Sequence, residues 1–289
     1  MTADGLVPGQ PAEPLHARRL VVIWAVLTVV AVPVVVLLLG PHLPPGNLSD
    51  EARDQRHVNI VLAALATPVL VGVWVYFVYT LAAFRQRGAA LEDGPPLRGH
   101  TGTQVTWVVA TGAIVIALAG WGTYELLGPA KGAGGGQGPD PLAVPKDAKS
   151  ALQVQVIGQQ WSWTFRYPGY GAFETPQLAI PAGRVVELHV TSLDVNHSFW
   201  AYELGVKADA IAGTDNVAFV RARHAGSFEI RCAELCGLWH GHMRTTGVVL
   251  SQPAFAAWVR GQEAANAPAT KVLPPYSSHY FPKPLRRAG

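Results

Sequence analysis

The 289-residue sequence predicts a membrane-anchored all-β protein, with transmembrane helices in the first half followed by a β-domain. Three observations support this fold class. The first half contains three long apolar runs, the second half alternates apolar and polar residues, and a stretch rich in glycine and proline separates them. Only 14% of the residues are charged, whereas a typical soluble domain has about 25%. The net charge of +3 gives no reason to expect nucleic acid as a partner.

The apolar runs predict three transmembrane helices, at residues 20–39, 58–84 and 105–127. Each run is long enough, because a helix needs about 20 apolar residues to cross a bilayer. The first run could instead be a secretory signal, since Arg18 and Arg19 precede it. It is longer than a usual signal core and no small-residue cleavage site follows, so a retained helix, or signal-anchor, is favoured.

The basic residues near the helix ends predict the orientation. Arg18 and Arg19 precede the first helix, and three arginines lie between the second and third: Arg85, Arg87 and Arg98. Because basic residues favour the cytoplasmic side, we expect the segment 1–19 in the cytoplasm and everything after Leu127 outside.

The second half predicts a flexible linker at 128–150, a β-domain at 151–251 and a C-terminal helix with an extended tail at 252–289. Alternating residues predict five strands: Gln160–Tyr167, Val186–Thr191, Asn216–Val220, Phe228–Cys232 and Gly247–Leu250. Several short strands with turns between them are typical of an all-β sandwich or barrel. The helix is expected at 253–262, with Ser251 as its cap.

Potential metal ligands are concentrated between Cys232 and Met243. Two thiols, an imidazole and a thioether fall within this segment: Cys232, Cys236, His240 and Met243. Such soft and borderline ligands select copper or zinc over magnesium or calcium. His197, which follows a predicted strand, is the best candidate to complete the site from a distant part of the chain. His242 is a weaker candidate than His240.

Four interpretations of these residues compete. A disulfide between Cys232 and Cys236 leaves His240 and Met243 without a role, and a structural zinc site gives none to Met243. A mononuclear blue-copper site leaves one cysteine over. A copper pair bridged by both thiolates, with His197 and His240 at its ends and Met243 as a weak ligand, uses every residue and is favoured.

These motifs resemble subunit II of the haem–copper cytochrome c oxidases around their dinuclear copper centre, CuA. The resemblance runs from about residue 153 to 250 through four segments: Gly158-Gln-Gln-Trp161-Ser-Trp163, Asp194-Val-Asn-His197-Ser-Phe-Trp200, Gly205-Val-Lys-Ala-Asp209 and Cys232-Ala-Glu-Leu-Cys236-Gly-Leu-Trp-His240-Gly-His-Met243. It implies a cupredoxin-like Greek-key β-barrel. It also implies that the carbonyl of Glu234 binds copper, that the Glu234 side chain helps hold an interface magnesium, and that Trp161 receives the electrons.

The resemblance further implies a function. The chain would accept electrons from cytochrome c at the copper pair and pass them to haem in subunit I, where oxygen is reduced to water and protons are pumped. Its expected partners are subunit I, subunit III, cytochrome c and the lipid bilayer of a bacterial-type cell membrane, with the copper domain on the outer face. No haem is expected on this chain. The alternatives are the equivalent subunit of a nitric oxide reductase and a membrane-tethered copper-binding protein.

The sequence departs from the family pattern in three respects. Gln104 stands where the family usually has a glutamate at the entrance of a proton channel, so that channel would need another entrance. The first apolar run adds a helix to the usual two. From Leu142 onward there are 14 Lys and Arg against 10 Asp and Glu, so the domain is not acidic. We therefore expect a cytochrome partner that is not strongly basic, or one that is tethered nearby.

Overall fold

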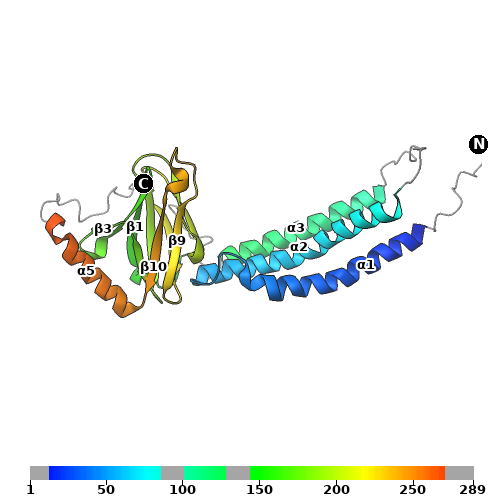
Figure 1. Ribbon diagram of the computed structural model, residues 1–289, viewed down its shortest axis with the longest axis horizontal. Coiled ribbons are helices and arrows are strands. Elements are labelled where there is room, and N and C mark those ends of the chain that lie inside the picture. The colour runs from blue at the N-terminus through cyan, green and yellow to red at the C-terminus, as the bar shows by residue number, and fades with distance from the viewer. Residues whose placement is uncertain (1–12, 86–100, 128–143, 271–289) are drawn as a thin grey trace, which may run out of the picture. The chain divides into compact units, whose positions relative to one another are not determined.

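A computed structural model describes residues 13–85, 101–127 and 144–270 in two units, which are treated separately below. Outside the described residues lie most of the predicted N-terminal segment, Arg87 and Arg98, most of the predicted linker, and the C-terminal tail from residue 271. Figure 1 shows the helices and the β-domain along the chain.

Three helices are long and apolar enough to cross a membrane, over Leu15–His42, Asp50–Ala83 and Thr101–Leu127. The first comprises α1 (Glu13–Pro33), one wider turn at Val34–Leu39 and one tighter turn at Gly40–His42, and the others are α2 (Asp50–Ala83) and α3 (Thr101–Leu127). The helix α2 begins eight residues before the predicted start at residue 58, because Ser49 caps it and its polar first turns have a partner in the β-domain.

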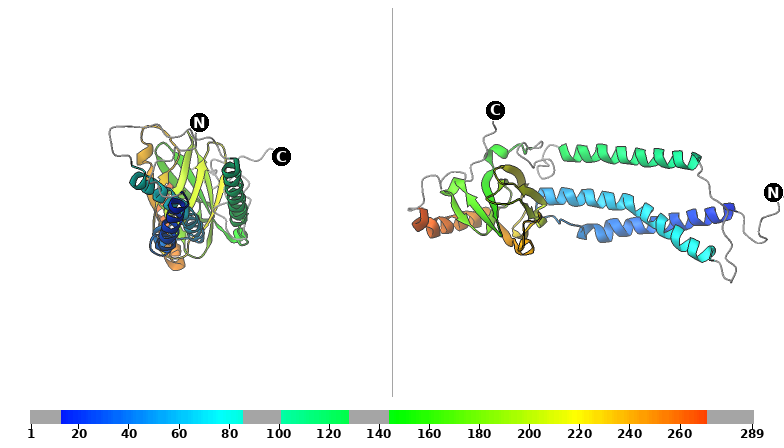
Figure 2. Two further views of the ribbon diagram at one scale, coloured as in Figure 1. Left: turned by 90° about the vertical axis from the view of Figure 1, so that its right-hand side faces the viewer. Right: turned by 90° about the horizontal axis from the view of Figure 1, so that it is seen from above.

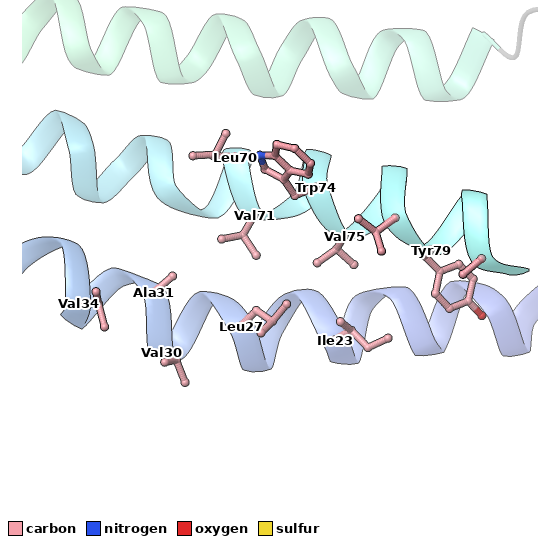
Figure 3. A pocket seen from close by; sticks show the side chains of 12 residues that line it. Ile23, Leu27, Val30, Ala31, Val34, Leu70, Val71, Trp74, Val75 and Tyr79 are labelled. Atoms are coloured by element: carbon pink, nitrogen blue, oxygen red, sulfur yellow. The ribbon is translucent and has the colours of Figure 1, made fainter.

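The helices α1 and α2 lie side by side (Figure 2). The indole nitrogen of Trp24 donates a hydrogen bond to the carbonyl of Pro68 at 2.8 Å, and Gly72 leaves room for the Trp24 ring. An apolar groove of about 640 Å³ runs between the two helices (Figure 3), lined by side chains such as Leu27 and Val71. Such a surface suits the interior of a bilayer, where lipid tails are as apolar as the side chains.

Two five-stranded sheets form the β-domain. The first sheet has the order β3-β2-β1-β5-β8 and the second has the order β4-β10-β9-β6-β7. The strands β1 and β5 pair in parallel, as do β10 and β4, and the other pairs are antiparallel. The bounds are β1 Leu152–Gln159, β2 Ser162–Tyr167, β3 Phe173–Thr175, β4 Leu178–Pro181, β5 Val185–Ser192, β6 His197–Ala201, β7 Val206–Ala210, β8 Asn216–Arg221, β9 Gly226–Cys232 and β10 Arg244–Leu250. A sandwich of this kind, after apolar helices, confirms the predicted fold class.

The core lies between the two sheets. Trp163, Phe165 and Tyr167 alternate along β2 and are all buried, with Phe165 packed edge-on against Phe199 of β6. The Tyr167 hydroxyl donates to the carbonyl of Ala179 in β4, which ties the first sheet to the second. A last helix, α5 (Gln252–Thr270), covers β3 with Phe255, Trp258 and Val259, and Ser251 caps it as expected.

The five predicted strands are present with shifted ends, and β1, β3, β4, β6 and β7 are additional. The predicted strand Gln160–Tyr167 begins only at Ser162, so Trp161 lies in the turn between β1 and β2 and is half-buried. The strand β4 is buried on both faces, which removes the alternation that a strand prediction depends on, whereas β1 alternates from Leu152 to Val156 and was missed.

The segment Leu48–Gln55 packs against the β-domain. Ser49 Oγ donates to the carbonyl of Leu204, Gln55 Nε2 donates to the carbonyl of Gly205, and the Glu51 carboxylate accepts from the backbone N–H of Arg221. Ala52 is fully buried and lies against Gly205. The first turns of α2 are therefore part of the β-domain's surface.

Candidate metal centre

Two strands of the second sheet bring predicted ligands to one end of the β-domain. His197 is the first residue of β6 and Cys232 is the last residue of β9, and these strands are antiparallel neighbours. The loop after Cys232 brings three further candidates back over the same end: Cys236, His240 and Met243. The topology therefore assembles ligands that lie 35 residues apart in the chain.

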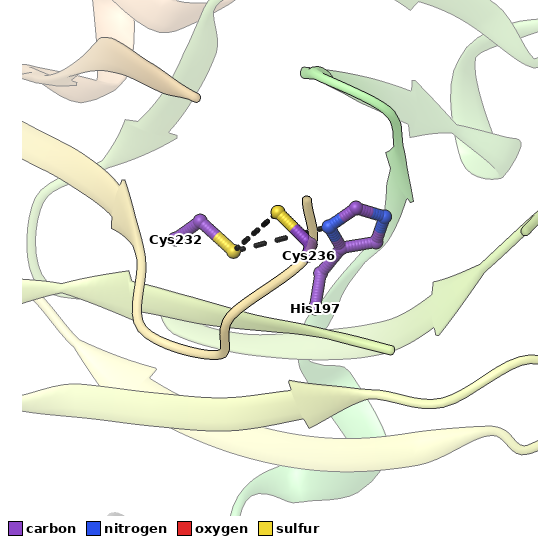
Figure 4. Close-up of side chains that lie close together, drawn as sticks. All are labelled: His197, Cys232 and Cys236. Atoms are coloured by element: carbon purple, nitrogen blue, oxygen red, sulfur yellow. Dashed lines mark hydrogen bonds between the residues drawn. The ribbon is translucent and has the colours of Figure 1, made fainter. Parts of the chain in front are cut away.

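The donor atoms form a continuous cluster around the two thiols. Cys232 Sγ lies 3.7 Å from Cys236 Sγ and 3.8 Å from His197 Nδ1 (Figure 4). Cys236 Sγ lies 3.5 Å from His240 Nδ1 and 3.8 Å from Met243 Sδ. Both cysteines are free and buried, so the disulfide interpretation has no support in the structure.

These distances fit metal ligation. Two ligands that bind one ion at about 2.0–2.3 Å with a near-tetrahedral angle are themselves about 3.3–3.8 Å apart. The thiol, imidazole and thioether contacts span 3.5–3.8 Å. Cys232 Sγ also lies 3.2 Å from the carbonyl oxygen of Glu234, where it donates a hydrogen bond. All the residues predicted to bind metal therefore lie in one site.

Asp194 fixes the orientation of His197. His197 Nε2 lies 2.9 Å from Asp194 Oδ1, which leaves Nδ1 directed at Cys232. A carboxylate behind a ligating histidine sets its tautomer and raises its basicity. Partial burial raises the pKa of Asp194, but hydrogen bonds from the Gln160 N–H, His197 and the Val195 N–H outweigh it, so the pKa is below its usual value.

Glycine makes room for this histidine. A Cβ on Gly158 would lie 3.1 Å from both the His197 ring and the Trp163 ring. The Trp163 ring packs edge-on at 6.1 Å from His197 and 5.7 Å from Phe199. These contacts make a close-packed wall, so the imidazole has little freedom to rotate.

The turn that carries Trp161 is bonded to the ligand loop. Trp161 Nε1 and Gln160 Nε2 both donate to the carbonyl of Cys236, at 3.2 and 2.8 Å. Gly237, with φ +111°, would place a Cβ 3.0 Å from the Gln160 amide. The sequence motifs contain Gln160 and Asp194 but do not reveal these roles. The available signal is their position, because Gln160 directly precedes Trp161 and Asp194 lies three residues before His197.

Burial and the neighbouring Cys232 thiol raise the pKa of the Cys236 thiol above its usual value. The two thiols cannot readily both ionise on their own, because like charges at this distance repel in a low dielectric. A bound cation would supply the opposite charge and displace the protons.

The remaining predicted residues lie around the cluster. The Glu234 side chain is exposed, and the ring of His242 packs edge-on against Trp239 at 5.3 Å. Large apolar side chains are also exposed at this end and are called the apolar rim: Leu193, Val195, Ile211, Leu235, Leu238 and Trp239. Leu235 and Leu238 are 79% and 84% exposed, and exposed apolar side chains grouped in this way are typical of surfaces that contact other proteins or membranes.

The fold and the site define a class: a membrane-anchored cupredoxin-like domain with a site of thiol, imidazole and thioether ligands at one end. Comparison with known proteins narrows the class. Residues 174–250 match the family model described as cytochrome c oxidase subunit II, periplasmic domain. The chain is 30% identical to cytochrome c oxidase subunit 2 of Synechocystis sp. over 83% of this chain and 81% of the relative, and 27% identical to that of Thermostichus vulcanus over 87% and 89%.

The chain therefore belongs to the cytochrome c oxidase subunit II family and is subunit II of a haem–copper oxidase. Among solved structures, the periplasmic domain of subunit II from Bradyrhizobium japonicum is 32% identical, covers 39% of this chain and 94% of that chain, and has a TM-score of 0.38. Amicyanin is 17% identical over 34% of this chain and 83% of that chain, with a TM-score of 0.22.

Proposed function

We propose that this subunit accepts electrons from cytochrome c at a dinuclear copper centre and passes them to haem in subunit I, where oxygen is reduced to water. The ligands are His197, Cys232, Cys236, His240, Met243 and the carbonyl oxygen of Glu234. The observation that carries the proposal is the cluster of donor atoms 3.2–3.8 Å apart around the two free thiols.

The arrangement favours two metal ions over one. His197 lies against Cys232 and His240 lies against Cys236, so the two imidazoles flank the thiol pair. A single tetrahedral ion would bind four ligands, whereas six donors are present. Copper is favoured because thiolate and thioether ligands select it and because zinc has no redox chemistry. When bound, a copper pair supplies a one-electron carrier.

The residues of this chain keep such a carrier rigid and connected. Asp194 holds His197, the wall around Trp163 limits movement, and Gln160 holds the carbonyl of Cys236. Trp161 is half-buried and hydrogen-bonded to the same carbonyl, so its ring connects the surface to a ligand residue. We propose that cytochrome c docks over Trp161 and part of the apolar rim.

The assignment as subunit II also implies an interface magnesium ion and further partner subunits. The exposed Glu234 side chain would help to hold magnesium at the contact with subunit I. We expect the complex to contain subunit III as well, and we expect subunit I to pump protons. The copper domain would lie on the outer face of the membrane. Gln104 lies in the first turn of α3 and cannot titrate, so a proton channel of the partner would open elsewhere.

The test uses the full oxidase complex purified with this chain. Metal analysis should find two coppers bound to this subunit in addition to copper in subunit I. Electron paramagnetic resonance should show one unpaired electron shared equally by two copper nuclei. A signal from one copper nucleus, or zinc at this site, would contradict the proposal. Oxygen consumption with reduced cytochrome c, compared with nitric oxide consumption, identifies the final acceptor.

A further inference from the structure

The apolar groove between α1 and α2 extends along only part of the two helices (Figure 3). Its lining runs from Ile23 to Val34 on α1 and from Leu70 to Ala82 on α2. At 1.5 Å per residue each of these stretches is about 16–18 Å long. The hydrocarbon core of a bilayer is roughly 30 Å thick, so the groove is about one leaflet deep.

The two helices run in opposite directions, so the first turns of α1 lie beside the last turns of α2. His16 Nδ1 lies 2.7 Å from the Tyr79 hydroxyl, and the His16 ring packs against the Phe84 ring at 4.9 Å. Beyond the other end of the groove, Gly40 is buried, and a Cβ there would lie 3.2 Å from the Ile60 side chain. This close approach leaves no room between the helices, and the groove stops before it.

Two cations lie at the end of the groove that contains Tyr79. Arg19 is four residues before Ile23, so it continues the face of α1 that lines the groove. Arg85 is three residues after Ala82, just past the end of α2. Both arginines are exposed, and neither forms an ion pair with another described residue.

The charge of this end is positive overall. The stretches 13–24 and 76–85 contain three arginines, Arg18, Arg19 and Arg85, against one acidic residue, Glu13. In the proposed orientation this end faces the cytoplasm, where the lipid surface is negatively charged. Arginine side chains at such a surface keep their charged heads among the headgroups while their stems lie along apolar groups. This end of the groove therefore matches an anionic headgroup.

The lining suits a flexible chain better than a further helix. Of the twelve residues that line the groove, only Ala31 and Ala82 are small, and the others are branched or aromatic. Helices that pack closely in membranes favour small residues at their contacts. A transmembrane helix also spans the full hydrocarbon core of roughly 30 Å, whereas the groove covers about half of it. An acyl chain of one leaflet ends near the middle of the bilayer and bends to follow an uneven surface.

We propose that this groove binds one acyl chain of an anionic phospholipid of the cytoplasmic leaflet, with the lipid phosphate held between Arg19 and Arg85. Tyr79 lies at the same end, where aromatic side chains commonly meet the headgroups. The lipid fills the space that the helix pair leaves open and so fastens the additional helix α1 to α2. The site is separate from the metal centre and does not depend on which metal is bound there.

The experiment places a diazirine analogue of leucine at Leu27, which lines the groove, in the full chain expressed with its partner subunits. The complex is reconstituted in vesicles of phosphatidylcholine with an equal share of phosphatidylglycerol and irradiated, and the adduct on this chain is identified by mass spectrometry. The adduct should be a phospholipid, and phosphatidylglycerol should exceed phosphatidylcholine several-fold. No adduct with phosphatidylglycerol above that with phosphatidylcholine is expected if the cations do not select the headgroup.

Two pairs of variants test the two halves of the site. Arg19→Gln should lower the phosphatidylglycerol adduct about five-fold, the factor that one basic residue contributes near an anionic lipid surface. Arg18→Gln is its matched control, because Arg18 is one residue away and faces another side of α1. Val71→Phe fills the groove and should abolish the lipid adduct, whereas Val73→Phe, 62% exposed and outside the lining, should not.

Arg19 is exposed and has no ion pair among the described residues, so its replacement tests the headgroup contact without disturbing the helix pair. A cross-link from position 27 to another subunit would overturn the inference, because the groove would then hold a partner helix. Equal adducts from the two lipids, or equal phosphatidylglycerol adducts in Arg19→Gln and Arg18→Gln, would overturn it as well. An undiminished adduct in Val71→Phe would show that the lipid lies outside the groove and would also contradict the proposal.

Discussion

The indole nitrogen of Trp161 lies 3.2 Å from the carbonyl oxygen of Cys236, and the Gln160 amide reaches the same oxygen at 2.8 Å. Two neighbouring side chains thus converge on one backbone group of Cys236, a proposed metal ligand. This arrangement makes Gln160 a positioning residue for the contact between Trp161 and the site. Several properties of the protein depend on such contacts between distant parts of the chain.

Replacing Gln160 by leucine removes the amide donor at nearly constant size. We expect the rate of electron transfer from reduced cytochrome c to fall about five-fold, because losing a hydrogen bond of roughly 1 kcal/mol lets the Cys236 carbonyl and the Trp161 ring move apart. Stopped-flow absorbance measures this rate, while the copper spectrum and KM should change little.

Gln159→Leu is the control for this experiment, because Gln159 is an exposed neighbour at the end of β1 whose side chain forms no hydrogen bond within the described part of the chain. Gln160→Glu, which keeps the shape and removes the donor, should resemble Gln160→Leu. Equal rates in the Gln159 and Gln160 variants would show that the amide does not position the Trp161 ring.

Asp194→Asn tests the support of His197. The carboxylate accepts hydrogen bonds from His197 and from the backbone N–H groups of Gln160 and Val195. In asparagine one of the two oxygens is replaced by an NH2 group, which would face one of these donors and could not accept from it. Copper affinity should fall about 10- to 100-fold, as for other carboxylates behind metal-bound histidines. Competition with a chelator of known affinity measures it.

Asp215→Asn is the comparison, since Asp215 pairs with His189 and not with a metal ligand. We expect its copper affinity to match the wild type. If Asp194→Asn bound copper as tightly as Asp215→Asn, the hydrogen bond to His197 would have no part in holding the metal.

The attachment of α2 to the β-domain is tested at Gly205. Its φ of +65° is costly for alanine, and an added Cβ would lie 2.8 Å from the Ala52 Cα. Gly183 has a similar φ of +78° but nothing within 4 Å of its added Cβ. Gly183→Ala should therefore cost about 1 kcal/mol of unfolding free energy, and Gly205→Ala about 1–3 kcal/mol more.

Thermal unfolding and limited proteolysis of the full chain measure this difference. Gly205→Ala should also make the bonds around Arg53 and Arg56 easier to cleave, because Leu48–Gln55 would leave the surface of the domain. Identical behaviour of the two alanine variants would mean that the contact with Ala52 adds nothing to stability.

The parts of this protein that were predictable are those encoded locally. The uncharged runs reveal the three long apolar helices, and four of the proposed ligands fall within the twelve residues from Cys232 to Met243. His197 was found because it follows a predicted strand. The contacts of Gln160 with Asp194 and of Glu51 with Arg221 join residues 34 and 170 positions apart, and no periodicity encodes such pairs. They follow from sheet order, which depends on the whole domain.

The burial of polar side chains in the strands is also not encoded locally. Gln155 and Arg166 lie on the outer face of the first sheet, where alternation predicts exposure, yet both are buried and hydrogen-bonded to each other. Arg166 is also paired with Glu174 on β3. This polar network buries Gln155 and Arg166 although the sequence of β1 alternates from Leu152 to Val156, as that of a strand with one exposed face would.

The last prediction concerns ionic strength. From Leu142 onward the chain carries 14 basic and 10 acidic residues, and the ligand loop that contacts Trp161 carries Leu235 and Leu238 of the apolar rim. Contacts of apolar groups are not screened by salt, whereas attraction between charged surfaces falls steeply as the Debye length shortens from about 10 Å at 0.1 M to about 3 Å at 1 M. The KM for cytochrome c should therefore change little over this range. Leu238→Asp should raise KM several-fold, and Val144→Asp, exposed outside the rim, should not. Steady-state oxygen uptake measures both effects. A steep loss of turnover with added salt in the wild type would show that charge, and not the rim, directs the docking.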